Sequence, residues 1–579
     1  MLVSLEAWSD ATAHDDALCI IGAGAAGITL ACELDGAPFP VLLVEAGGAH
    51  PDQAAAADYG GSATAPHPEP SQYRRFGFGG TTGIWGGRCV PYEPIDFERR
   101  DYVANSGWPI GYEEVARFYP RALEYCDAGR FDFNAPSAIA HAPPTIAGFE
   151  SGGMIDADGI ERYSLPTDFG KRERERLGRS RNVTTLLHAR CVGLDKAAGE
   201  DRIEAAVLVD RAGHRRRLRA RTFVVSAGGI ETARLLFASD PQGAGLGNRT
   251  DRLGRFYMCH FENCIGSLAP HGAAVAFDFE KTSDGVYCRR KLRFTPAAQR
   301  EHRLLNTAYR LHFPEYSDAS HRSAAMSAIY LAKRTLIGEY RDILQHGAEA
   351  TPSPRSAHLR NVALGLPELG KFAFDWLFLR RLARRKLPYT LVRNADGSFP
   401  LEFNCEQTPS ERNRVRPGSD SDRHGLRRAQ VDWCVVEEDV EAAARGLLLL
   451  RESVNGRSAC RVEFAEGELN HRLRRSVPLG GHQIGTTRMA ATPRAGVVDP
   501  HCAVFDLPNL YIASSAVFPT SSHANPTLTI VALAIRLAER LRAVLDPGAV
   551  DAGVSASRDP FESSPAPARG APSPAASSQ

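Results

Sequence analysis

The stretch that decides the fold is Ala17-Leu18-Cys19-Ile20-Ile21, an apolar run that leads directly into Gly22-Ala23-Gly24-Ala25-Ala26-Gly27. The residues that follow, Ile28 to Leu34, are compatible with a helix. Val41 to Val44 is a second apolar run, which ends at Glu45. This order predicts a strand, a glycine-rich turn, a helix and a second strand, which together make one βαβ unit.

The glycine-rich turn has the spacing of a dinucleotide-binding site. Gly22, Gly24 and Gly27 allow the backbone to approach a pyrophosphate closely, and the helix that follows offers free N–H groups to its charge. Glu45, eighteen residues beyond Gly27, can accept hydrogen bonds from ribose hydroxyls. An acidic residue at this position disfavours a 2′-phosphate but leaves both NAD and FAD open.

Composition narrows the class of protein. The 579 residues are 43% hydrophobic and 24% charged with a formal net charge of +1, which is typical of a globular protein and gives no reason to expect a nucleic-acid partner. The twelve cysteines form no Cys-x-x-Cys pair and no Cys/His cluster, so we expect buried thiols in a reducing compartment and no metal site. The acidic N-terminus does not fit a targeting signal, and no apolar run approaches the ~18–20 residues of a membrane span. We therefore expect a cytoplasmic protein without a transmembrane segment.

A second strand–glycine–helix junction lies about two hundred residues after the first. The run from Arg217 to Val225 ends in Ser226-Ala227-Gly228-Gly229 and continues into the helix-compatible Ile230 to Phe237. Two earlier runs, 183–192 and 203–209, are also strand-like. The middle of the chain, 266–475, is less patterned and is consistent with a separate substrate domain.

Two later segments differ in composition from the rest. The stretch 372–386 is apolar at its start and basic at its end, which predicts an amphipathic helix. That helix either packs on its own domain with a solvated basic end or docks on a membrane surface or a partner. The tail 547–579 is rich in Pro, Ala, Ser and Gly and is predicted to be disordered.

Three further motifs are informative. Residues 76–88 contain six glycines around Trp85, which suits a loop lying against a flat ring and also a tight surface loop. Near the C-terminus come Gly481-His482-Gln483-Ile484-Gly485-Thr486 and then Ser521-Ser522-His523-Ala524-Asn525-Pro526-Thr527-Leu528-Thr529.

In this order, these motifs resemble the glucose–methanol–choline (GMC) family of FAD oxidoreductases, together with 226–234, Glu406-Gln407 and 413–415. The surroundings of His482 and Asn525 are most similar to the branch of pyranose oxidase and related sugar and glycoside oxidoreductases. The resemblance implies an α/β fold, with a Rossmann-like FAD-binding domain and a second α+β substrate-binding domain built on an antiparallel sheet. The expected boundaries are 14–265 and 476–545 for the FAD-binding domain and 266–475 for the substrate-binding domain.

By this resemblance His482 matches the catalytic base and Asn525 the residue that orients the substrate. Hydride transfer from an alcohol requires removal of the hydroxyl proton, for which a neutral imidazole is well suited. Asn525 can hold the alcohol oxygen without competing for the proton, and it is also a plausible N-cap of the helix that follows. A catalytic role for His523 is left open, and His260 is interpreted as structural.

The resemblance also implies the cofactor contacts. Gly80, Thr81, Thr82 and Trp85 are expected to line the flavin, with Ala227, Gly228 and Glu231 near the adenosine half. A helix is expected to begin at Asn525, Pro526 and Thr527, and its dipole would stabilise the reduced flavin ring. Some relatives carry a flavin-linked histidine where this chain has Ile84, so we expect non-covalent FAD.

The leading hypothesis is an FAD-dependent oxidoreductase that acts on a CH–OH group of a sugar, glycoside or sugar-containing metabolite. The alternatives are a non-sugar alcohol such as a sterol, polyol or choline-like compound, a lyase that keeps FAD without redox chemistry, and a non-catalytic flavoprotein that docks through the basic end of 372–386. The electron acceptor is open between dioxygen, a quinone and a carrier protein.

Overall fold

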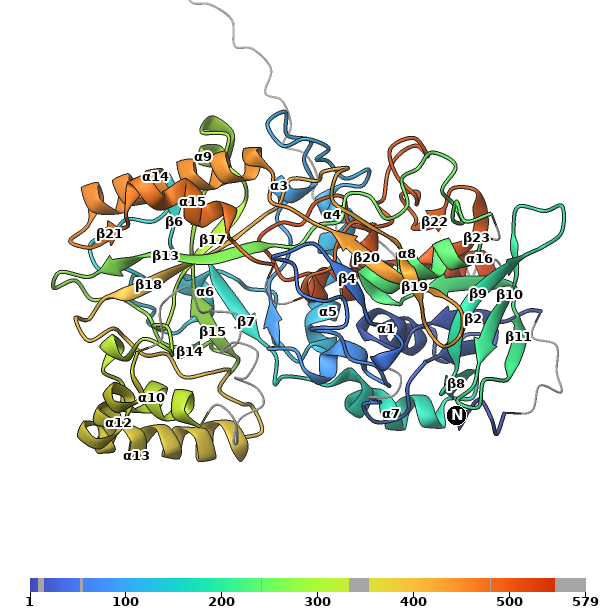
Figure 1. The fold of residues 1–579 in the computed structure, drawn as a ribbon, viewed down its shortest axis with the longest axis horizontal. Helices are drawn as coiled ribbons and strands as arrows, with labels where there is room; N and C mark the ends of the chain where they lie inside the picture. The colour runs from blue at the N-terminus through green and yellow to red at the C-terminus, as the bar shows by residue number, and fades with distance from the viewer. Residues whose placement is uncertain (9–14, 53–55, 241, 333–352, 479–480, 547–579) are drawn as a thin grey trace, which may run out of the picture.

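The computed structural model describes residues 1–8, 15–52, 56–240, 242–332, 353–478 and 481–546, so the predicted disordered tail lies outside the described residues. Figure 1 shows two parts side by side: a mainly parallel sheet with its helices on the right and an antiparallel sheet on the left. Among the described residues, no helix has both the length and the apolar character needed to cross a membrane.

The sheet of the first part has seven strands. In spatial order they are β1 (Leu2–Ser4), β8 (Val183–Leu187), β3 (Val41–Val44), β2 (Leu18–Ile21), β12 (Thr222–Val225), β23 (Leu507–Ile512) and β22 (Ala503–Val504). Every neighbouring pair is parallel except β22 and β23. The central strands β2, β3 and β12 are buried along their whole length, as expected of a parallel sheet covered on both faces.

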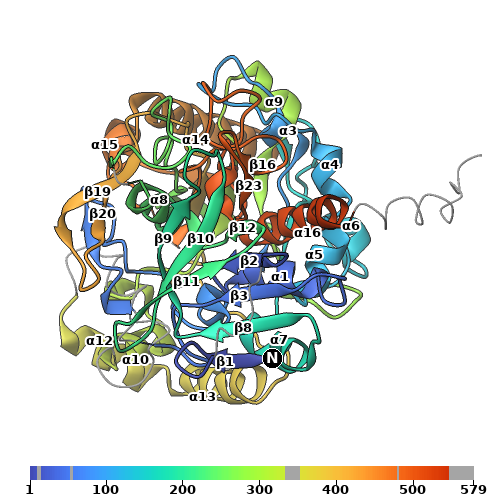
Figure 2. The same ribbon diagram turned by 90° about the vertical axis from the view of Figure 1, so that its right-hand side faces the viewer.

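The predicted βαβ unit is confirmed. Strand β2 pairs in parallel with β3, and α1 (Ala25–Glu33) connects them. A Cβ on Gly27 would lie 1.9 Å from the carbonyl oxygen of Gly22, so only glycine lets α1 approach the turn this closely. The C-terminal helix α16 (Thr527–Leu545) packs beside α1 (Figure 2).

Two of the strand-like runs are divided in the structure. His188 has a left-handed backbone with φ +53°, and this turn separates β8 from β9 (Arg190–Lys196). Strand β9 joins β10 (Ile203–Val209) and β11 (Arg215–Arg219) in a separate antiparallel sheet. A single strand over 183–192 is therefore wrong, and the run 217–225 likewise splits between β11 and β12.

The second part is built on a six-stranded antiparallel sheet. Its spatial order is β21 (Arg461–Glu463), β13 (Phe261–Ala269), β18 (Phe399–Cys405), β17 (Thr307–Leu311), β16 (Leu292–Phe294) and β6 (Ile155–Asp156). Helices α14 (Glu437–Arg457) and α15 (Leu469–Arg474) lie over one face (Figure 1). Aromatic pairs across neighbouring strands, such as Phe261 with Phe403, fill the core beneath them.

Two small sheets connect distant parts of the chain. One consists of β14 (Glu280–Lys281), β15 (Tyr287–Arg290), β7 (Ile160–Tyr163) and β5 (Arg88–Cys89), and the other of β19 (Arg414–Ser421), β20 (Arg427–Asp432) and β4 (Gly61–Ala63). Strand β5 directly follows the glycine-rich loop, and its pairing with β7 places Arg88 opposite Tyr163. The domain boundaries expected from the sequence remain predictions.

The other α-helices of the described residues are α3 (Pro94–Phe97), α4 (Tyr112–Ala116), α5 (Tyr119–Tyr125), α6 (Ala135–Ala138), α7 (Phe169–Arg179), α8 (Gly228–Ala238), α9 (Pro296–Glu301), α10 (Ala324–Leu331), α12 (Arg355–Leu364) and α13 (Leu366–Phe374).

The predicted amphipathic helix 372–386 differs in its bounds. Helix α13 continues as a π-helical turn over Asp375–Arg381, after which the chain is not helical. Arg385 lies beyond the end of the helix and donates hydrogen bonds to the carbonyl oxygens of Asp127 and Tyr163, which draw the chain back to the body of the protein. Part of its apolar side packs on its own domain, since Phe372 lies against a small core that contains Phe313 and Met326. Phe374, Phe378 and Leu382 are exposed.

Candidate active site

A cavity of about 570 Å³ lies at the carboxyl ends of the central parallel strands and extends to His482 and Asn525. Most of the predicted site residues line it: Gly22, Gly24, Glu45, Gly80, Thr81, Thr82, Trp85, Ala227, Gly228, Glu231, His482, Asn525, Pro526 and Thr527. Gly27 is not among the lining residues and serves the close packing of α1 instead.

Three helices begin at this cavity. Helix α1 starts after Gly24, α8 after Ala227 and α16 after Pro526, and all three of these residues line the cavity. A Cβ on Gly24 would meet no atom within 4 Å, so the backbone here is open to an approaching ligand. Since a helix N-terminus offers unpaired N–H groups and a positive dipole end, the cavity favours an anionic ligand.

The side chain of Glu45 holds the backbone near the N-terminus of α1 through hydrogen bonds. Its carboxylate accepts hydrogen bonds from the backbone N–H groups of Ala23 at 3.0 Å, Gly47 at 2.9 Å and Gly77 at 3.0 Å. A carboxylate has about four acceptor positions, so one remains for a ribose hydroxyl. The side chain therefore ties the dinucleotide turn to the glycine-rich loop and keeps capacity for the ligand.

The glycine-rich loop forms a short 3₁₀ helix, Gly80–Gly83. The hydroxyl of Thr82 donates to the carbonyl of Gly79 at 2.6 Å and accepts from the N–H of Phe169 at 3.1 Å. The Trp85 indole donates to the carbonyl of Thr167 at 2.9 Å, which fixes the loop against its neighbour. Ile84 lines the cavity with 48% of its surface exposed, and an alkyl side chain there has no atom able to bond covalently to a flavin.

These features fit FAD. The helix N-termini at the cavity suit the pyrophosphate of FAD, and the carboxylate of Glu45 suits a ribose. The Gly80–Trp85 loop borders the same cavity as His482. Arg190 lies over the ring of Tyr59, 4.6 Å from its centroid, and both residues line the cavity.

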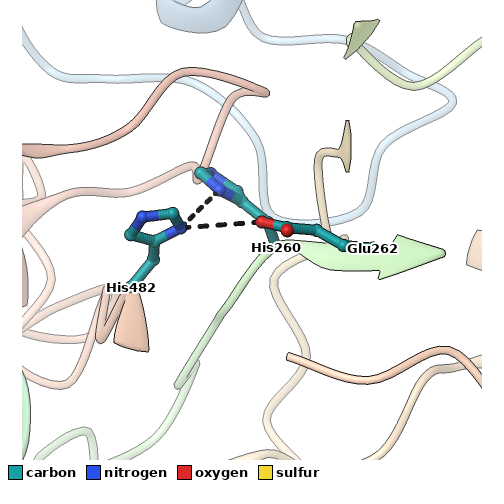
Figure 3. Close-up of side chains that lie close together, drawn as sticks. All are labelled: His260, Glu262 and His482. Carbon is teal, nitrogen blue, oxygen red and sulfur yellow. Dashed lines mark hydrogen bonds and ion pairs between the residues drawn. The ribbon is translucent and has the colours of Figure 1, made fainter. Parts of the chain in front are cut away.

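Beyond the residues expected to hold the dinucleotide, two histidines form a direct pair. Figure 3 shows the side chains of His260, Glu262 and His482 pointing toward one another. The Nδ1 atoms of His260 and His482 are 2.9 Å apart, and a carboxylate oxygen of Glu262 lies 3.9 Å from Nδ1 of His482. The second ring nitrogen of His260 lies 3.1 Å from the carbonyl oxygen of Ser521.

This chain of contacts fixes the tautomers. A carbonyl oxygen only accepts, so Nε2 of His260 carries the proton and its Nδ1 is the acceptor. His482 must then donate from its own Nδ1–H, which leaves a lone pair on Nε2. Nε2 of His482 faces the amide nitrogen of Asn525 at 2.9 Å, a contact that requires this lone pair. Both histidines are neutral in this arrangement.

Burial supports neutral histidines. Desolvation lowers the pKa of His260 to about 4. Desolvation, followed by the proximity of His260, Arg88 and Arg310, holds the pKa of His482 well below its usual value. Desolvation also raises the pKa of Glu262 to about 8, so its carboxyl is protonated at neutral pH. An imidazole with a low pKa and an unprotonated Nε2 is in its base form throughout the physiological range.

The same three residues have ligand atoms close enough to be considered as a metal site, within 4.8 Å of one another. The distance of 2.9 Å between the two Nδ1 atoms is that of a hydrogen bond. Two nitrogens bound to one tetrahedral Zn²⁺ at about 2.0–2.1 Å would lie farther apart. We therefore interpret the cluster as a proton-binding site and retain the expectation of no metal as a prediction.

Asn525 does not act as the predicted N-cap. Helix α16 begins at Thr527 with Pro526 at the capping position and no side-chain cap, because the amide of Asn525 is turned toward His482 instead. Its Oδ1 is buried without a hydrogen-bond partner among the described residues. The amide is therefore held at the cavity with unused hydrogen-bonding capacity.

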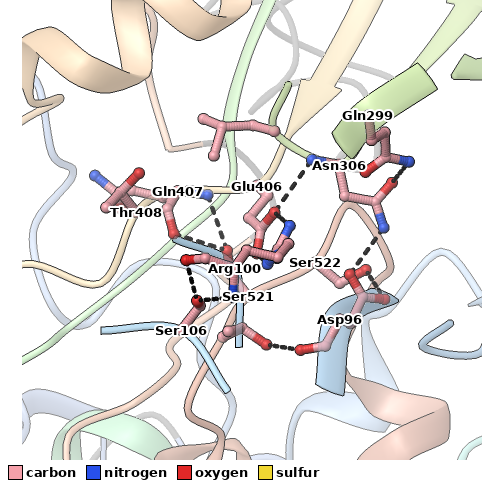
Figure 4. A network of polar contacts seen from close by, with 12 residues as sticks. Asp96, Arg100, Ser106, Gln299, Asn306, Glu406, Gln407, Thr408, Ser521 and Ser522 are labelled. Atoms are coloured by element: carbon pink, nitrogen blue, oxygen red, sulfur yellow. Dashed lines mark hydrogen bonds and ion pairs between the residues drawn. The ribbon is translucent and has the colours of Figure 1, made fainter. Parts of the chain in front are cut away.

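A buried polar network supports the segment that carries Asn525 (Figure 4). Asp96 accepts a hydrogen bond from the hydroxyl of Ser522 at 2.8 Å, and the amide of Asn306 donates to Asp96 at the same distance. The N–H of Gln407 donates to the hydroxyl of Ser521 at 2.9 Å.

Beside these contacts, Arg100 and Glu406 form a buried bidentate ion pair. Since the carbonyl of Ser521 also accepts from His260, the network fixes both members of the His482–Asn525 pair relative to each other.

The sequence interpretation missed some residues of this site. His260, taken as structural, contacts His482 directly, and Glu262 and Arg88 line the cavity beside it. The available signal was the spacing of two between His260, directly before β13, and Glu262 on it, which places both side chains on one face if the extended backbone includes residue 260. His523 is fully buried against Lys291, with 2.6 Å between Nε2 and Nζ, and is not among the residues lining the cavity.

A cavity that suits a dinucleotide and ends at a neutral His–Asn pair fits an alcohol oxidoreductase that uses a flavin. Residues 409–534 match the family model described as GMC oxidoreductase. The chain is 24% identical to a 2-methyl-1,2-propanediol dehydrogenase of Mycolicibacterium austroafricanum over 79% of both proteins. It is also 24% identical to a paromamine 6′-oxidase of Streptomyces fradiae over 90% of both. It is 22% identical to a fructose dehydrogenase large subunit of Gluconobacter japonicus over 90% of this chain and 97% of that protein.

Solved structures agree on the fold. A fungal aryl-alcohol oxidase superposes with a TM-score of 0.52 at 14% identity, covering 91% of this chain and 98% of that one. A pyridoxine 4-oxidase from Mesorbium loti gives 0.50 at 18% identity, over 90% and 98%. The comparisons identify the chain as an FAD-dependent oxidoreductase acting on CH–OH groups, with residues 409–534 matching the GMC oxidoreductase family.

Proposed function

We propose that this enzyme oxidises a hydroxyl group of a sugar, glycoside or sugar-containing metabolite to the ketone or aldehyde. The observation that carries the proposal is the neutral His482 with its Nε2 lone pair directed at Asn525 on the cavity wall. An alcohol oxygen placed between these two groups can donate its proton to His482 and accept a hydrogen bond from Asn525.

The residues of the chain then have distinct roles. FAD, when bound, supplies the acceptor for the hydride that leaves the carbinol carbon. Nε2 of His482 takes the hydroxyl proton as general base. The imidazolium that forms keeps its Nδ1–H hydrogen bond to His260, whose own Nε2–H keeps its hydrogen bond to the carbonyl of Ser521. Asn525 holds the alcohol oxygen in place during the transfer.

Polar side chains around His482 support a substrate with several hydroxyls. Arg88, Glu262, Tyr163 and Tyr389 line the cavity, and the protonated carboxyl of Glu262 can both donate and accept a hydrogen bond. Two of the relatives are named for paromamine and fructose, which supports a sugar substrate.

A small diol is the second candidate, favoured by the 2-methyl-1,2-propanediol dehydrogenase among the relatives. We propose FAD held without a covalent bond, because Ile84 occupies the loop position at the cavity. A cytoplasmic location also remains a proposal, supported by the twelve cysteines, all of which are free thiols.

The test is anaerobic mixing of the FAD-loaded protein with pools of sugars, glycosides, small diols and sterols while the visible flavin band is monitored. We expect sugars or glycosides to bleach it. Bleaching by the diol pool alone would favour the second candidate. Conversion of a sugar without any bleaching would contradict the redox role and indicate a lyase.

A further inference from the structure

The helical projection formed by α12, α13 and the π-helical turn carries an unusual amount of exposed apolar surface. It lies at the lower edge of the molecule in Figures 1 and 2. Eight of the twelve large hydrophobic side chains that are exposed in the described residues belong to it: Leu359, Leu364, Leu366, Phe374, Leu377, Phe378, Leu379 and Leu382. Leu364 is 74% exposed and Leu382 is 65% exposed. A cluster of this kind marks an interaction surface.

The exposed charges of the projection are all positive. Between Ser353 and Lys386 the exposed charged residues are Arg355, Arg360, Lys371, Arg381, Arg384 and Lys386. The two acidic residues of this stretch are not exposed. Glu368 accepts from the N–H of Ala324 at 2.9 Å, and Asp375 is only partly exposed and pairs with Lys371 at 3.1 Å. The whole protein has a net charge of only +1, so this positive charge is concentrated locally.

We propose that this projection docks the enzyme on the surface of an anionic lipid bilayer. Apolar side chains enter the boundary between headgroups and acyl chains, while the surrounding Arg and Lys side chains contact lipid phosphates. The rings of Phe374 and Phe378 lie 4.6 Å apart and form one apolar tip. Attachment is peripheral, since no described helix can cross a membrane.

A second copy of the chain fits this surface less well. A symmetric dimer would place the same patch on both sides of the interface, so the six cations of one subunit would face those of the other. Like charges brought together in this way oppose association. An anionic bilayer supplies both the apolar layer and the opposite charge.

The projection is also connected to the cavity. Arg380 donates to the carbonyl of Leu387 at 2.8 Å, and the N–H of Lys386 donates to the carbonyl of Leu165 at 3.1 Å. These two contacts lead the chain back to Pro388 and Tyr389, which line the cavity. Docking through the projection would therefore hold the substrate cavity close to the bilayer surface.

The test uses the full-length, FAD-loaded protein and vesicle flotation. The vesicles are of phosphatidylcholine alone or contain about one third phosphatidylglycerol, an anionic lipid of the kind that attracts basic segments. We expect binding to the anionic vesicles only, weakened by high salt. The triple variant Phe374→Ser, Phe378→Ser, Leu382→Ser should lower the bound fraction by about tenfold or more, because the inserted apolar surface is lost.

A second variant tests the charges. Arg360→Gln with Arg381→Gln and Arg384→Gln should lower the affinity for anionic vesicles by about fivefold per cation removed. Controls on other surfaces, Phe131→Ser for the apolar change and the pair Arg179→Gln, Arg249→Gln for the loss of charge, should bind as the wild type does. All these side chains are exposed, so folding and FAD content should not change.

Three results would overturn the proposal: no binding to anionic vesicles, equal binding by the triple variant, or dimerisation in solution that the triple variant abolishes while lipid binding is absent. The last result would assign the surface to a second copy of the chain. Since flotation requires no turnover, failure of this proposal is distinguishable from failure of the proposed sugar oxidation.

Discussion

The most informative perturbation is at His260, which the structure makes a positioning residue for His482. Its Nδ1 accepts from Nδ1–H of His482 at 2.9 Å, and its Nε2–H donates to the carbonyl of Ser521 at 3.1 Å. His260→Gln can retain the hydrogen bond to the carbonyl of Ser521 but loses the hydrogen bond from His482. His260→Asn places an amide oxygen near the position of Nδ1 and can retain the hydrogen bond from His482.

The expected decrease in the rate of flavin reduction follows from the loss of the hydrogen-bond acceptor for Nδ1–H of His482. A buried donor left without a partner costs about 1–3 kcal/mol, and His482 would recover part of this by exchanging its tautomer, which removes the lone pair from Nε2. We therefore expect His260→Gln to slow flavin reduction by about 5- to 150-fold, the equivalent of that free energy. His260→Asn should be closer to the wild type.

The assay is anaerobic stopped-flow reduction of bound FAD over a range of substrate concentrations, which separates the limiting rate from substrate affinity. We expect the limiting rate to fall with little change in the apparent Kd, since His260 is not among the residues that line the cavity. Equal rates for the Gln and wild-type proteins, or an equal loss for Gln and Asn, would refute the tautomer assignment.

Further predictions concern the base, the cofactor and the fold. Because the pKa of His482 is held well below its usual value, the rate of flavin reduction should stay constant as the pH falls through 6.5, the usual value for histidine; an acid limb at or above that pH would contradict this. The Glu262 carboxyl, with a pKa of about 8, should ionise above that pH, favour protonation of His482 and raise the rate, an inflection that Glu262→Gln should remove. Glu45→Ala leaves three N–H groups unpaired and should weaken FAD binding by about tenfold or more, measured by fluorescence titration of the apoprotein. With Ile84 in the loop, acid precipitation should release the yellow colour into the supernatant, and colour in the pellet would show a covalent bond. Gly27→Ala, whose Cβ would meet the Gly22 carbonyl at 1.9 Å, should lower the free energy of unfolding by about 1–3 kcal/mol, measured by urea denaturation.

Much of the cofactor site could be predicted from the sequence because its determinants are local. The Gly22–Gly27 turn requires glycine for backbone reasons that are visible in the pattern. The position of Glu45 follows from the length of one βαβ unit. The glycine-rich loop around Trp85 and the second junction at Ala227 are also continuous segments, and the structure places both on the cavity.

The environment of the base could not be predicted in the same way. His260 and His482 are 222 residues apart in the chain, and their contact depends on how β13 leads back to the FAD-binding part. The network of Asp96, Asn306 and Ser522 likewise joins three distant segments. Packing between such segments is set by the whole fold, so a single sequence gives the residue types but not the pairs.

For the helical projection, the sequence predicted the composition but not the helix bounds or the exposure of its side chains. Its amphipathic composition is visible in the sequence, but the helix starts at Leu366 and ends at Arg381, earlier at both ends than predicted. Beyond its end, Arg385 contacts the carbonyls of Asp127 and Tyr163, two residues far away in the sequence. Exposure of Phe374 and Leu382 is a tertiary property that periodicity does not report.

The central claim is that His482 removes the proton of an alcohol whose hydride reduces FAD. The most direct measurement is the rate of anaerobic flavin bleaching by the best substrate in the wild type and in His482→Ala, with FAD content and substrate affinity checked in both. We predict that the variant binds FAD and substrate but is reduced about 10²- to 10⁴-fold more slowly, the usual contribution of a general base. Bleaching of His482→Ala at the wild-type rate would contradict the account.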